Sequence, residues 1–378
     1  MPKISVILTS FNHAKYIQEA IDTVLNQTLA DFELIILDDC SSDNSWGLIN
    51  QYSDPRIKAY RSEGQGEVAC RLNNAISEVA AGEYIAIHHS DDAWEPDKLE
   101  KQVAYLQAHP EVGAVFTKAR VIAEDSTPLP DGQHFYVRFF DQPNRTRHEW
   151  LRYFFSQGNA LCHPSVLIRK VCYQECGLYR YGLAQVPDLD MWMRLCLKYE
   201  IHILPDKLVR FRARADDANA SGNRPDTRIR GVYEYYKLLP TYQMIESFAE
   251  LVKVFPSAKK YDRGDESNRD FALAMVALEE KPFPFTQLFG LDLLFGIISD
   301  PQCAANIKRL YDFDYRNFIA LTAQHDVFAR EELVARDNII AGRDKVIAAR
   351  DATIDHIYAS RSWRLTRPLR AIANLLTR

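Results

Sequence analysis

Short apolar runs alternate with amphipathic segments along the N-terminal third of the chain. Four runs rich in apolar side chains predict strands, at residues 4–8, 32–37, 57–60 and 84–87, the first, second and last of them buried. Between and after them, apolar residues recur at helical spacing over residues 17–25, 66–80 and 96–106. Strands that alternate with helices predict an α/β fold with a mainly parallel central sheet. Ligands of such sheets bind beyond the carboxyl ends of the strands.

Residues that commonly begin or end helices mark the boundaries of these segments. Ser41 or Ser42 is expected to cap the helix after the second strand, because a serine oxygen accepts a hydrogen bond from a free backbone N–H. Gly82 is expected to close the helix that precedes it, and Pro96 is expected to begin the next one.

The character of the sequence changes in its second half. From about Tyr233 the helical stretches become longer and richer in aromatic residues, which predicts a helical accessory region. We therefore divide the chain into an α/β domain at residues 1–224, a helical accessory region at 225–325 and a C-terminal segment at 326–378. The longest apolar stretch, at about residues 283–298, contains a charged residue and is too short to span a bilayer.

A seven-residue repeat dominates the first part of the C-terminal segment. Arg-Asp pairs begin at Arg336, Arg343 and Arg350, and isoleucines recur with the same period at Ile340, Ile347 and Ile354. A repeat of this period predicts a helix that joins a short coiled coil. The apolar stripe is narrow, because arginine occupies the other seam position, so the repeat fits packing against the chain's own domain equally well. A homo-oligomer and an intramolecular contact are therefore both left open.

Residues 361–378 form a basic segment with five arginines and no acidic residue. Apolar residues accompany them at close to helical spacing, namely Trp363, Leu365, Leu369, Ile372 and Leu376. A basic amphipathic helix of this kind is expected to lie on an anionic membrane surface. Docking on the protein itself is the alternative, since Pro368 would kink a continuous helix. Co-sedimentation of the full chain and of a chain ending at Ser360 with anionic vesicles separates the two interpretations.

Composition narrows the class and the compartment of the protein. Charged residues make up 26% of the 378 residues and the formal net charge is −5, which is ordinary for a globular protein and does not indicate a nucleic-acid binder. The seven cysteines are scattered and form no Cys-x-x-Cys pair, a pattern that suits a reducing cytoplasm. A strand-like run begins at Ile4, so no signal peptide is expected. We therefore expect a cytoplasmic protein, placed at the inner face of the cell membrane if its tail binds lipid.

Polar residues follow three of the predicted strands. Thr9, Asp39 and Asp92 each stand at or just after a strand end, and parallel strands bring such residues to one edge of a sheet. A single acidic residue in this position is commonly a helix cap. Three polar strand ends in one domain instead predict a binding site.

Asp91 and Asp92 give the sharpest local signal. Two carboxylates in a surface loop between a buried strand and a helix are suited to a hard divalent cation, Mg²⁺ or Mn²⁺. Such a cation bridges phosphate oxygens and neutralises a leaving diphosphate. The alternative is an N-terminal helix cap, which is disfavoured because the helix is expected to start later, near Pro96.

Three further candidates each allow two interpretations. Asp39 is suited to accept hydrogen bonds from a base or a ribose, or to cap a turn. Phe11 offers a flat face on which a base can stack, or it belongs to the core. Asp188 and Asp190 stand just before an amphipathic helix, where one suffices as a cap and the other is free for general-base chemistry.

Several familiar site patterns are absent from the sequence. There is no Walker A sequence, GxGxxG fingerprint, HExxH or GxSxG motif. His88 and His89 precede the aspartate pair, but neighbouring strand residues point to opposite faces. Both are therefore not expected to bind one zinc ion.

Several stretches together resemble family 2 glycosyltransferases, which have the GT-A fold. The opening ISVILTSFNHAKYIQEAIDTVLNQTLADFELIILDDCSSDNS resembles the start of that family, and AAGEYIAIHHSDDAWEPDKLEKQV resembles its metal-binding DxD segment. HPSVLIRK, CGLYR and PDLDMWMRL resemble its acceptor-side half. The resemblance covers about residues 3–220 in the family's order, and this combination is highly specific.

The resemblance implies an inverting transfer of a sugar from a nucleotide sugar to an acceptor hydroxyl, with roles for particular residues. Carried over by position, Thr9 and Phe11 line the nucleoside pocket. Asp39 binds the base, commonly uracil. Asp91 contacts the ribose or the sugar, and Asp92 ligates Mg²⁺ or Mn²⁺.

The family's catalytic base falls on Asp188, and Arg71 lies in a segment often near the diphosphate. Two departures from the family pattern stand out. The base usually follows an acidic residue, and here that position is Pro187. A loop that often carries a histidine near the diphosphate or the metal reads LVRFRARADDANAS here, with Arg214 in its place. An arginine is suited to pair with the diphosphate directly.

The C-terminal SRSWRLTRPLR resembles a tail found on many bacterial polysaccharide-assembly glycosyltransferases. This implies cell-surface polysaccharide synthesis, with a UDP-sugar as donor and a saccharide or lipid-linked saccharide as acceptor. The alternative is a catalytically inactive nucleotide-sugar-binding scaffold, which the two departures favour, whereas intact Asp39, Asp92 and Asp188 favour an enzyme. A sugar-phosphate nucleotidyltransferase would need a glycine-rich, basic loop after the first strand, and residues 9–12 have neither feature.

Overall fold

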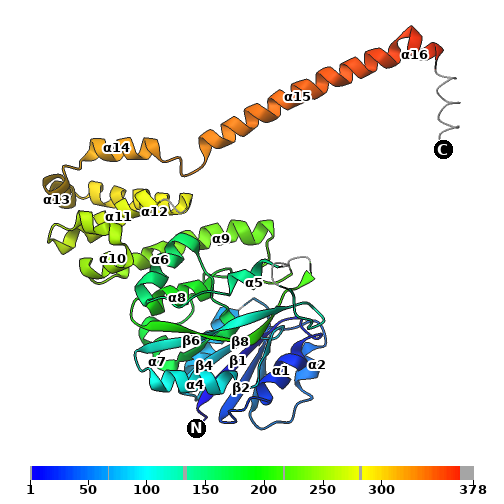
Figure 1. The fold of residues 1–378 in the computed structure, drawn as a ribbon, viewed down its shortest axis with the longest axis vertical. Coiled ribbons are helices and arrows are strands. Elements are labelled where there is room, and N and C mark those ends of the chain that lie inside the picture. The colour runs from blue at the N-terminus through cyan, green and yellow to red at the C-terminus, as the bar shows by residue number, and fades with distance from the viewer. Residues whose placement is uncertain (1, 67, 131–133, 216–217, 281–282, 367–378) are drawn as a thin grey trace. The chain divides into compact units, whose positions relative to one another are not determined.

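The computed structural model describes residues 2–66, 68–130, 134–215, 218–280 and 283–366. The chain forms two compact units, Met1–Asp314 and Tyr315–Arg378. The first unit contains the sheet (Figure 1). Each unit is described by itself below.

Within the described residues the first unit has one eight-stranded sheet, with the order β3-β2-β1-β4-β7-β6-β8-β5. The strands are β1 (Ile4–Ser10), β2 (Phe32–Asp38), β3 (Ile57–Arg61), β4 (Tyr84–His89), β5 (Ala93–Trp94), β6 (Val112–Ile122), β7 (Leu167–Arg169) and β8 (Glu200–Arg212). Strands β1 to β4 pair in parallel, as do β6 and β8, whereas β7 and β5 pair antiparallel with their neighbours. The predicted α/β fold with a mainly parallel sheet is confirmed.

Helices cover both faces of this sheet. In the N-terminal part they are α1 (Ile17–Leu25), α2 (Ser45–Ile49), α3 (Val68–Asn74), α4 (Lys98–Ala108), α5 (Phe135–Phe139), α6 (Arg147–Gln157), α7 (Lys170–Cys176) and α8 (Pro187–Cys196). Side chains alternate along β1, so Leu8 packs in one core with Ile21 of α1, while Ile7 lies in a second core with Trp150 of α6 and Trp192 of α8. The site residues therefore lie at the carboxyl ends of strands that pack between two hydrophobic cores, and we call this end of the sheet the strand edge.

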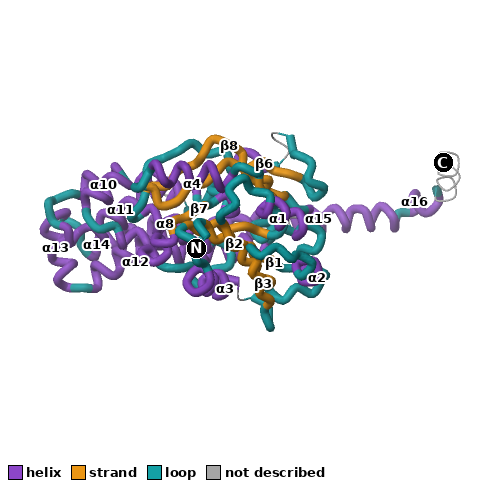
Figure 2. Tube along the Cα trace, turned by 90° about the horizontal axis from the view of Figure 1, so that it is seen from below, coloured by secondary structure: helices purple, strands orange, loops and turns teal. Residues whose placement is uncertain are grey.

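The helices after β8 extend one of these cores. They are α9 (Pro225–Leu238), α10 (Phe248–Val254), α11 (Arg269–Glu280), α12 (Pro284–Ser299) and α13 (Pro301–Tyr311), with short 3₁₀ helices at Leu239–Met244, Pro256–Tyr261 and Glu266–Asn268. Leu251 of α10 and Leu273 of α11 belong to the same cluster of buried residues as Trp150. Figures 1 and 2 show α10 to α13 lying together beyond one end of the sheet. The predicted helical region is thus joined to the α/β part by a continuous core.

Two predicted helix starts are wrong. Helix α2 begins at Ser45 with Asn44 at its N-cap and no side-chain cap, so neither Ser41 nor Ser42 caps it. Ser41 instead donates a hydrogen bond to the Asp38 carboxylate, which satisfies its hydroxyl elsewhere. Helix α4 begins at Lys98, two residues after Pro96.

Gly82 does not close a helix as predicted. The helix that starts with α3 continues as a π-helix at Ala75–Val79 and ends at Ala80. Gly82 lies against β1, where a Cβ atom would stand only 2.5 Å from the backbone nitrogen of Ser5. Glycine is needed there for the close approach of two backbone segments.

The second unit consists of helices α14 (Tyr315–Gln324), α15 (Arg330–Ala359) and α16 (Arg361–Leu365). Helix α15 spans the seven-residue repeat without a break, and Ile340, Ile347 and Ile354 on it are 45–55% exposed. The predicted helix is therefore confirmed, and its self-association stays a prediction. Much of the basic tail, including Arg367, Pro368, Leu369, Arg370, Ile372 and Leu376, lies outside the described residues.

Among the described helices, none is both long and apolar enough to cross a bilayer by itself. Only α12 and α13 taken together reach that threshold, and they are bent by 107° relative to each other. This agrees with the expectation for the apolar stretch at residues 283–298.

Candidate functional site

The polar strand ends predicted from the sequence meet at one edge of the sheet. In the parallel pairing of β1 with β4, Thr9 lies opposite His89, and in the pairing of β1 with β2, Ser10 lies opposite Asp38. The loops that carry Phe11, Asp39 and the aspartate pair therefore leave the sheet side by side. This edge is where ligands of such sheets bind.

Asp38 is the last residue of β2 and Asp39 follows it, and the two carboxylates have different hydrogen-bond partners. Asp38 is buried and accepts hydrogen bonds from the backbone and the hydroxyl of Ser41, at 3.0 and 2.5 Å. Ser41 also accepts a bond from the Asn12 backbone, which ties the loop after β2 to the loop after β1. Phe11, in the loop after β1, is 41% exposed, so it is not a core residue.

The Asp39 carboxylate is hydrogen-bonded by residues that follow β3 in the sequence. Its carboxylate accepts a hydrogen bond from Arg71 Nη1 at 3.0 Å and one from the Gly66 backbone nitrogen at 2.9 Å. Gly66 has a φ of +89°, a left-handed conformation that glycine adopts without strain. The structure thus brings two predicted donor-binding residues, Asp39 and Arg71, into direct contact.

Asp92 is a buried carboxylate with one unsatisfied oxygen. It is 2% exposed, and its Oδ1 accepts a hydrogen bond from the Arg212 backbone at 2.8 Å, whereas its Oδ2 has no hydrogen-bond partner among the described residues. Burial, together with the neighbouring charge of Asp91, raises the pKa of Asp92 well above its usual range. The expected surface loop is wrong, because β5 pairs with β8 directly after Asp92 and draws it inward.

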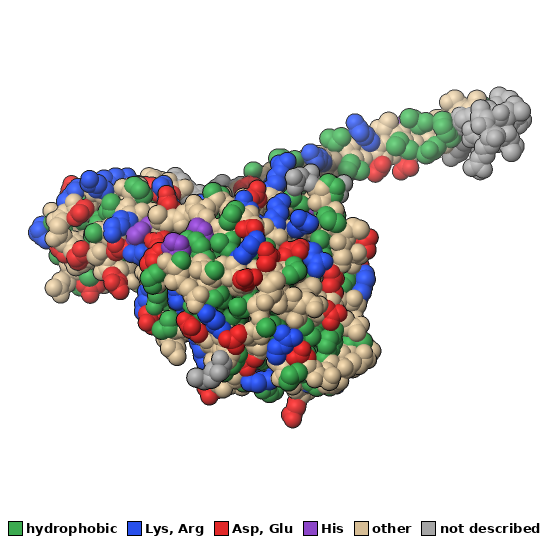
Figure 3. Space-filling view, turned by 60° about the horizontal axis from the view of Figure 1, so that its bottom comes forward, with side chains coloured by type: hydrophobic (Ala, Val, Ile, Leu, Met, Phe, Trp, Pro, Cys, Tyr) green, Lys and Arg blue, Asp and Glu red, His purple; other side chains and the backbone are tan. Residues whose placement is uncertain are grey.

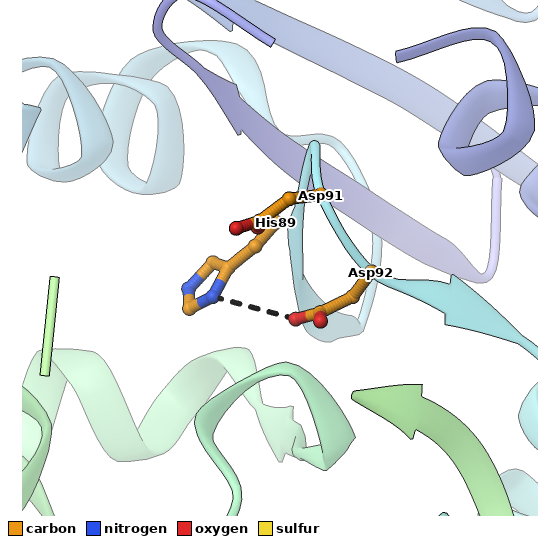
Figure 4. A group of neighbouring side chains, drawn as sticks. All are labelled: His89, Asp91 and Asp92. Atoms are coloured by element: carbon orange, nitrogen blue, oxygen red, sulfur yellow. Dashed lines mark ion pairs between the residues drawn. The ribbon is translucent and has the colours of Figure 1, made fainter. Parts of the chain in front are cut away.

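The loop does not serve as a helix cap, because α4 begins at Lys98 with Asp97 at its N-cap. A buried carboxylate oxygen without a partner is unfavourable, and a bound cation is one way to satisfy it. The metal-ligating atoms of His89, Asp91 and Asp92 lie within 4.8 Å of one another. Figure 4 shows the His89 ring and the Asp92 carboxylate pointing toward each other. The donor set therefore fits the predicted divalent cation.

Arg212 fixes the aspartate loop from β8, and sequence reasoning missed it. Its side chain is only 1% exposed. Its Nε donates to the carbonyl of Asp91 at 2.7 Å, and its guanidinium pairs with Glu19 of α1 at 2.5 Å. An arginine buried in this way holds the loop in one position relative to the sheet.

Arg214, the second departure from the family pattern, does reach the aspartate loop. Its Nη1 lies 2.9 Å from Nε2 of His13, and that nitrogen lies 3.8 Å from the Asp91 carboxylate. Because arginine only donates, His13 must accept through Nε2 and donate through Nδ1, which stands 2.7 Å from the Ser90 hydroxyl. Burial lowers the pKa of His13, which is consistent with this neutral form. His13 was not predicted.

The structure separates the roles of the two aspartates in α8. The helix begins at Pro187 and neither aspartate caps it. Asp190 is buried between two arginines, at 2.8 Å from Arg194 and 3.1 Å from Arg180, so it is part of a structural ion-pair network. Asp188 is left as the candidate for general-base chemistry.

Asp188 is held by a neutral donor. Burial raises its pKa to about 6, and its Oδ2 accepts a hydrogen bond from Asn159 Nδ2 at 2.6 Å. Asn159 is itself fixed, because its backbone donates to the Tyr235 hydroxyl of α9 at 3.2 Å and its side-chain oxygen accepts from the Leu161 backbone. Asn159 and Tyr235 were missed, since no local pattern marks them.

Asp188 and the aspartate loop belong to one region. The ring of His163 stands between them: its centroid lies 5.1 Å from that of His89 and 5.7 Å from that of Trp192 in α8, the helix that carries Asp188. Nε2 of His163 also lies 3.1 Å from the Tyr179 hydroxyl. The candidate proton acceptor and the candidate cation site thus belong to elements that both contact His163.

Charged side chains of both signs are interspersed over the face of the first unit seen in Figure 3. This mixed surface differs from the continuous basic face expected of a nucleic-acid binder.

Comparison with known proteins gives a consistent picture. Residues 5–171 match the model of Glycosyl transferase family 2. The chain is 30% identical over 202 residues to the putative glycosyltransferase EpsE of Bacillus subtilis, covering 51% of this chain and 66% of that protein. It is 39% identical over 130 residues to the putative teichuronic acid biosynthesis glycosyltransferase TuaG of the same organism, covering 34% and 51%. The chain thus spans about half to two thirds of these curated relatives.

Among solved structures, S. aureus TarS 1-349 in complex with UDP-GlcNAc superposes with a TM-score of 0.52 and 17% identity, covering 77% of this chain and 89% of that one. At this identity the likeness concerns the fold alone. The residues that match the family model include strands β2 to β7 of the sheet and all of β1 but its first residue.

Proposed function

Because the chain carries a glycosyl transferase family 2 domain with the GT-A fold, we propose that it transfers a sugar from a UDP-sugar to an acceptor hydroxyl, with inversion at the anomeric carbon. We further propose that it acts in the synthesis of a bacterial cell-surface polysaccharide on a saccharide or lipid-linked saccharide acceptor. The relatives support both parts: TuaG is named for teichuronic acid biosynthesis, and TarS has been solved with UDP-GlcNAc.

The observation that carries this proposal is the link between the Asp92 loop and the Asp188 helix through His163, whose ring lies 5.1 Å from that of His89 and 5.7 Å from that of Trp192. One carboxylate has a pKa raised to about 6 and a neutral hydrogen-bond donor, Asn159. The other presents an unsatisfied buried oxygen. A proton acceptor and a cation site near one another are what displacement of a diphosphate by a hydroxyl requires.

In the proposed reaction, Asp188 accepts the proton of the acceptor hydroxyl as that oxygen forms a bond to the anomeric carbon. The bond between this carbon and the diphosphate oxygen breaks, and the nucleoside diphosphate leaves on the opposite face. A pKa of about 6 keeps Asp188 ionised at neutral pH while its basicity stays higher than that of an ordinary aspartate. A divalent cation on Asp92 would neutralise the charge that grows on the diphosphate.

The donor is expected to lie across the strand edge. Exposed Phe11 stacks on the base and Asp39, oriented by Arg71, accepts hydrogen bonds from it. Arg214 contacts His13, and His13 in turn contacts Asp91. From this position the Arg214 guanidinium pairs with the diphosphate.

Calorimetric titration with UDP and GDP tests the donor part of this proposal. We expect UDP to bind more tightly than GDP, and its affinity to fall when Mn²⁺ is replaced by a chelator. The Asp39→Ala variant is expected to lose the preference for UDP. Equal binding of both nucleotides by the unaltered protein would remove the assignment of a UDP-sugar.

Asn159→Ala is expected to shift the acidic limb of the pH profile of kcat/KM to higher pH. The Asn159 amide donates to the ionised form of Asp188, so its loss makes that form less favourable and raises the pKa above about 6. The limb is measured from initial rates between about pH 5 and pH 8, the range that brackets this pKa.

Tyr235→Phe is the matched control for this prediction. It removes the hydroxyl that accepts the Asn159 backbone bond but keeps the amide that contacts Asp188, so its shift is expected to be smaller. A slower Asn159→Ala enzyme whose limb stays in the original position would mean that the amide does not position the base.

A further inference from the structure

The ring of His89 has no assigned task in the proposed reaction, yet it faces the unsatisfied oxygen of Asp92. Its Nδ1 lies 3.8 Å from Asp92 Oδ2 (Figure 4), and among the described residues that oxygen has no hydrogen-bond partner. The exposed fractions of the side chains are 2% for Asp92, 13% for Asp91 and 32% for His89. The cluster is therefore buried at its aspartates and opens to solvent past the imidazole.

The strand explains why His89 and not His88 is placed here. Neighbouring residues of β4 point to opposite faces, and the ring of His88 packs on Trp94 with centroids 4.3 Å apart. His89 lies on the face of Thr9, at the strand edge. The alternation of side chains along β4 therefore places His88 in the core and His89 at the candidate cation site.

We propose that His89 is a third protein ligand of the cation, so that the site is a His-Asp-Asp set with one nitrogen donor and carboxylate oxygens. This rests on the proposed function only in placing the cation at Asp92. Two donors on one ion with bonds of about 2.2 Å stand at most about 4.4 Å apart, so a cluster within 4.8 Å closes on an ion with a shift of a few tenths of an ångström.

A nitrogen ligand changes which cation the site prefers. Mg²⁺ takes oxygen donors and gives up its waters reluctantly, whereas imidazole suits transition metals. His89 therefore biases the site toward Mn²⁺ and its first-row neighbours and against Mg²⁺. Replacing His89 by aspartate would give an all-oxygen set and lessen that bias.

Pulsed electron paramagnetic resonance on the full-length protein with Mn²⁺ and UDP tests the ligand directly. A coordinated imidazole gives a nitrogen-14 modulation of the Mn²⁺ echo. We expect this signal in the unaltered protein and in the controls His13→Gln and His163→Gln, which remove the two neighbouring imidazoles, and its loss in His89→Gln. No signal in the unaltered protein, or a signal that survives His89→Gln, overturns the proposal and leaves His89 as an ion-pair partner of Asp92.

Metal titrations of the same variants supply a second readout that does not depend on turnover. His89→Gln is expected to weaken Mn²⁺ binding at least about 10-fold, because loss of an outer-shell partner alone has an effect of that size. His89→Asp is expected to bind Mg²⁺ and Mn²⁺ more equally than the unaltered protein does. An unchanged ratio in His89→Asp contradicts the proposal. Sugar transfer without the nitrogen signal would refute only the claim that His89 ligates the cation. The signal without sugar transfer would refute only the proposed transferase activity.

Discussion

Asp188→Asn is expected to lower the turnover number by a factor on the order of a hundred or more and to leave UDP affinity nearly unchanged. Asparagine keeps the shape of the side chain but cannot take a proton from the acceptor hydroxyl. Asp188 is proposed to act on the acceptor hydroxyl and not to bind the nucleoside diphosphate, so UDP affinity should not change. Initial rates and calorimetry on the same preparations separate the two quantities.

The pH dependence gives this prediction a sign. Burial raises the pKa of Asp188 to about 6, so the carboxylate is protonated and inactive as a base below that pH. We expect kcat/KM to fall about tenfold per pH unit on the acid side and to level off above it. In Asp188→Asn this limb should disappear from the residual activity.

Asp190→Asn is the matched control, because it makes the same chemical change two residues away in the same helix. Asp190 is paired with Arg194 and Arg180, so its loss is expected to lower thermal stability while folded protein still turns over. If Asp190→Asn removes turnover per folded molecule and Asp188→Asn does not, the base is misassigned.

Asp92→Asn is expected to abolish detectable transfer and to remove the effect of Mn²⁺ on donor binding. The amide oxygen can still accept the hydrogen bond from the Arg212 backbone, so the loop should keep its position. The charge that holds the cation is gone, however. Activity assays with Mn²⁺ and UDP titrations with and without chelator measure the two effects.

Comparison of Asp92→Ala with Asp92→Asn separates the effect of losing the cation from the effect of losing stability. Alanine leaves the buried Arg212 N–H without an acceptor, a loss worth about 1–3 kcal/mol of stability, so this variant should melt earlier than Asp92→Asn. Both should be equally inactive. Full activity in Asp92→Asn, or in the unaltered protein with excess chelator, would show that the aspartate pair does not hold a required cation.

The local pattern of the sequence was sufficient for strands β1 to β4 and for the polar residues at their ends. Apolar runs and helical spacing depend on neighbours a few residues apart, and parallel pairing then brings Thr9, Asp39 and Asp92 to one edge. Family resemblance added the roles of individual residues, and those roles remain proposals.

What the sequence could not show are partners that come from far along the chain. Arg212 contacts Asp92 across 120 residues, and Asn159 contacts Asp188 across 29. The burial of Asp92 depends on β5, a two-residue strand too short to leave a periodic signal. The capping error at Ser41 has the same origin, since its hydroxyl is taken by Asp38, a partner that helix-start rules do not consider.

Release of nucleoside diphosphate tests the central claim most directly. The full-length protein is incubated with a panel of UDP-, GDP- and dTDP-sugars, each with Mn²⁺ or with chelator, and free nucleoside diphosphate is quantified, with Asp92→Asn as the blank. The account predicts slow release from at least one UDP-sugar, dependent on Mn²⁺ and absent in the variant. Nucleotide-sugar binding without release from any donor would contradict it and would favour a catalytically inactive scaffold.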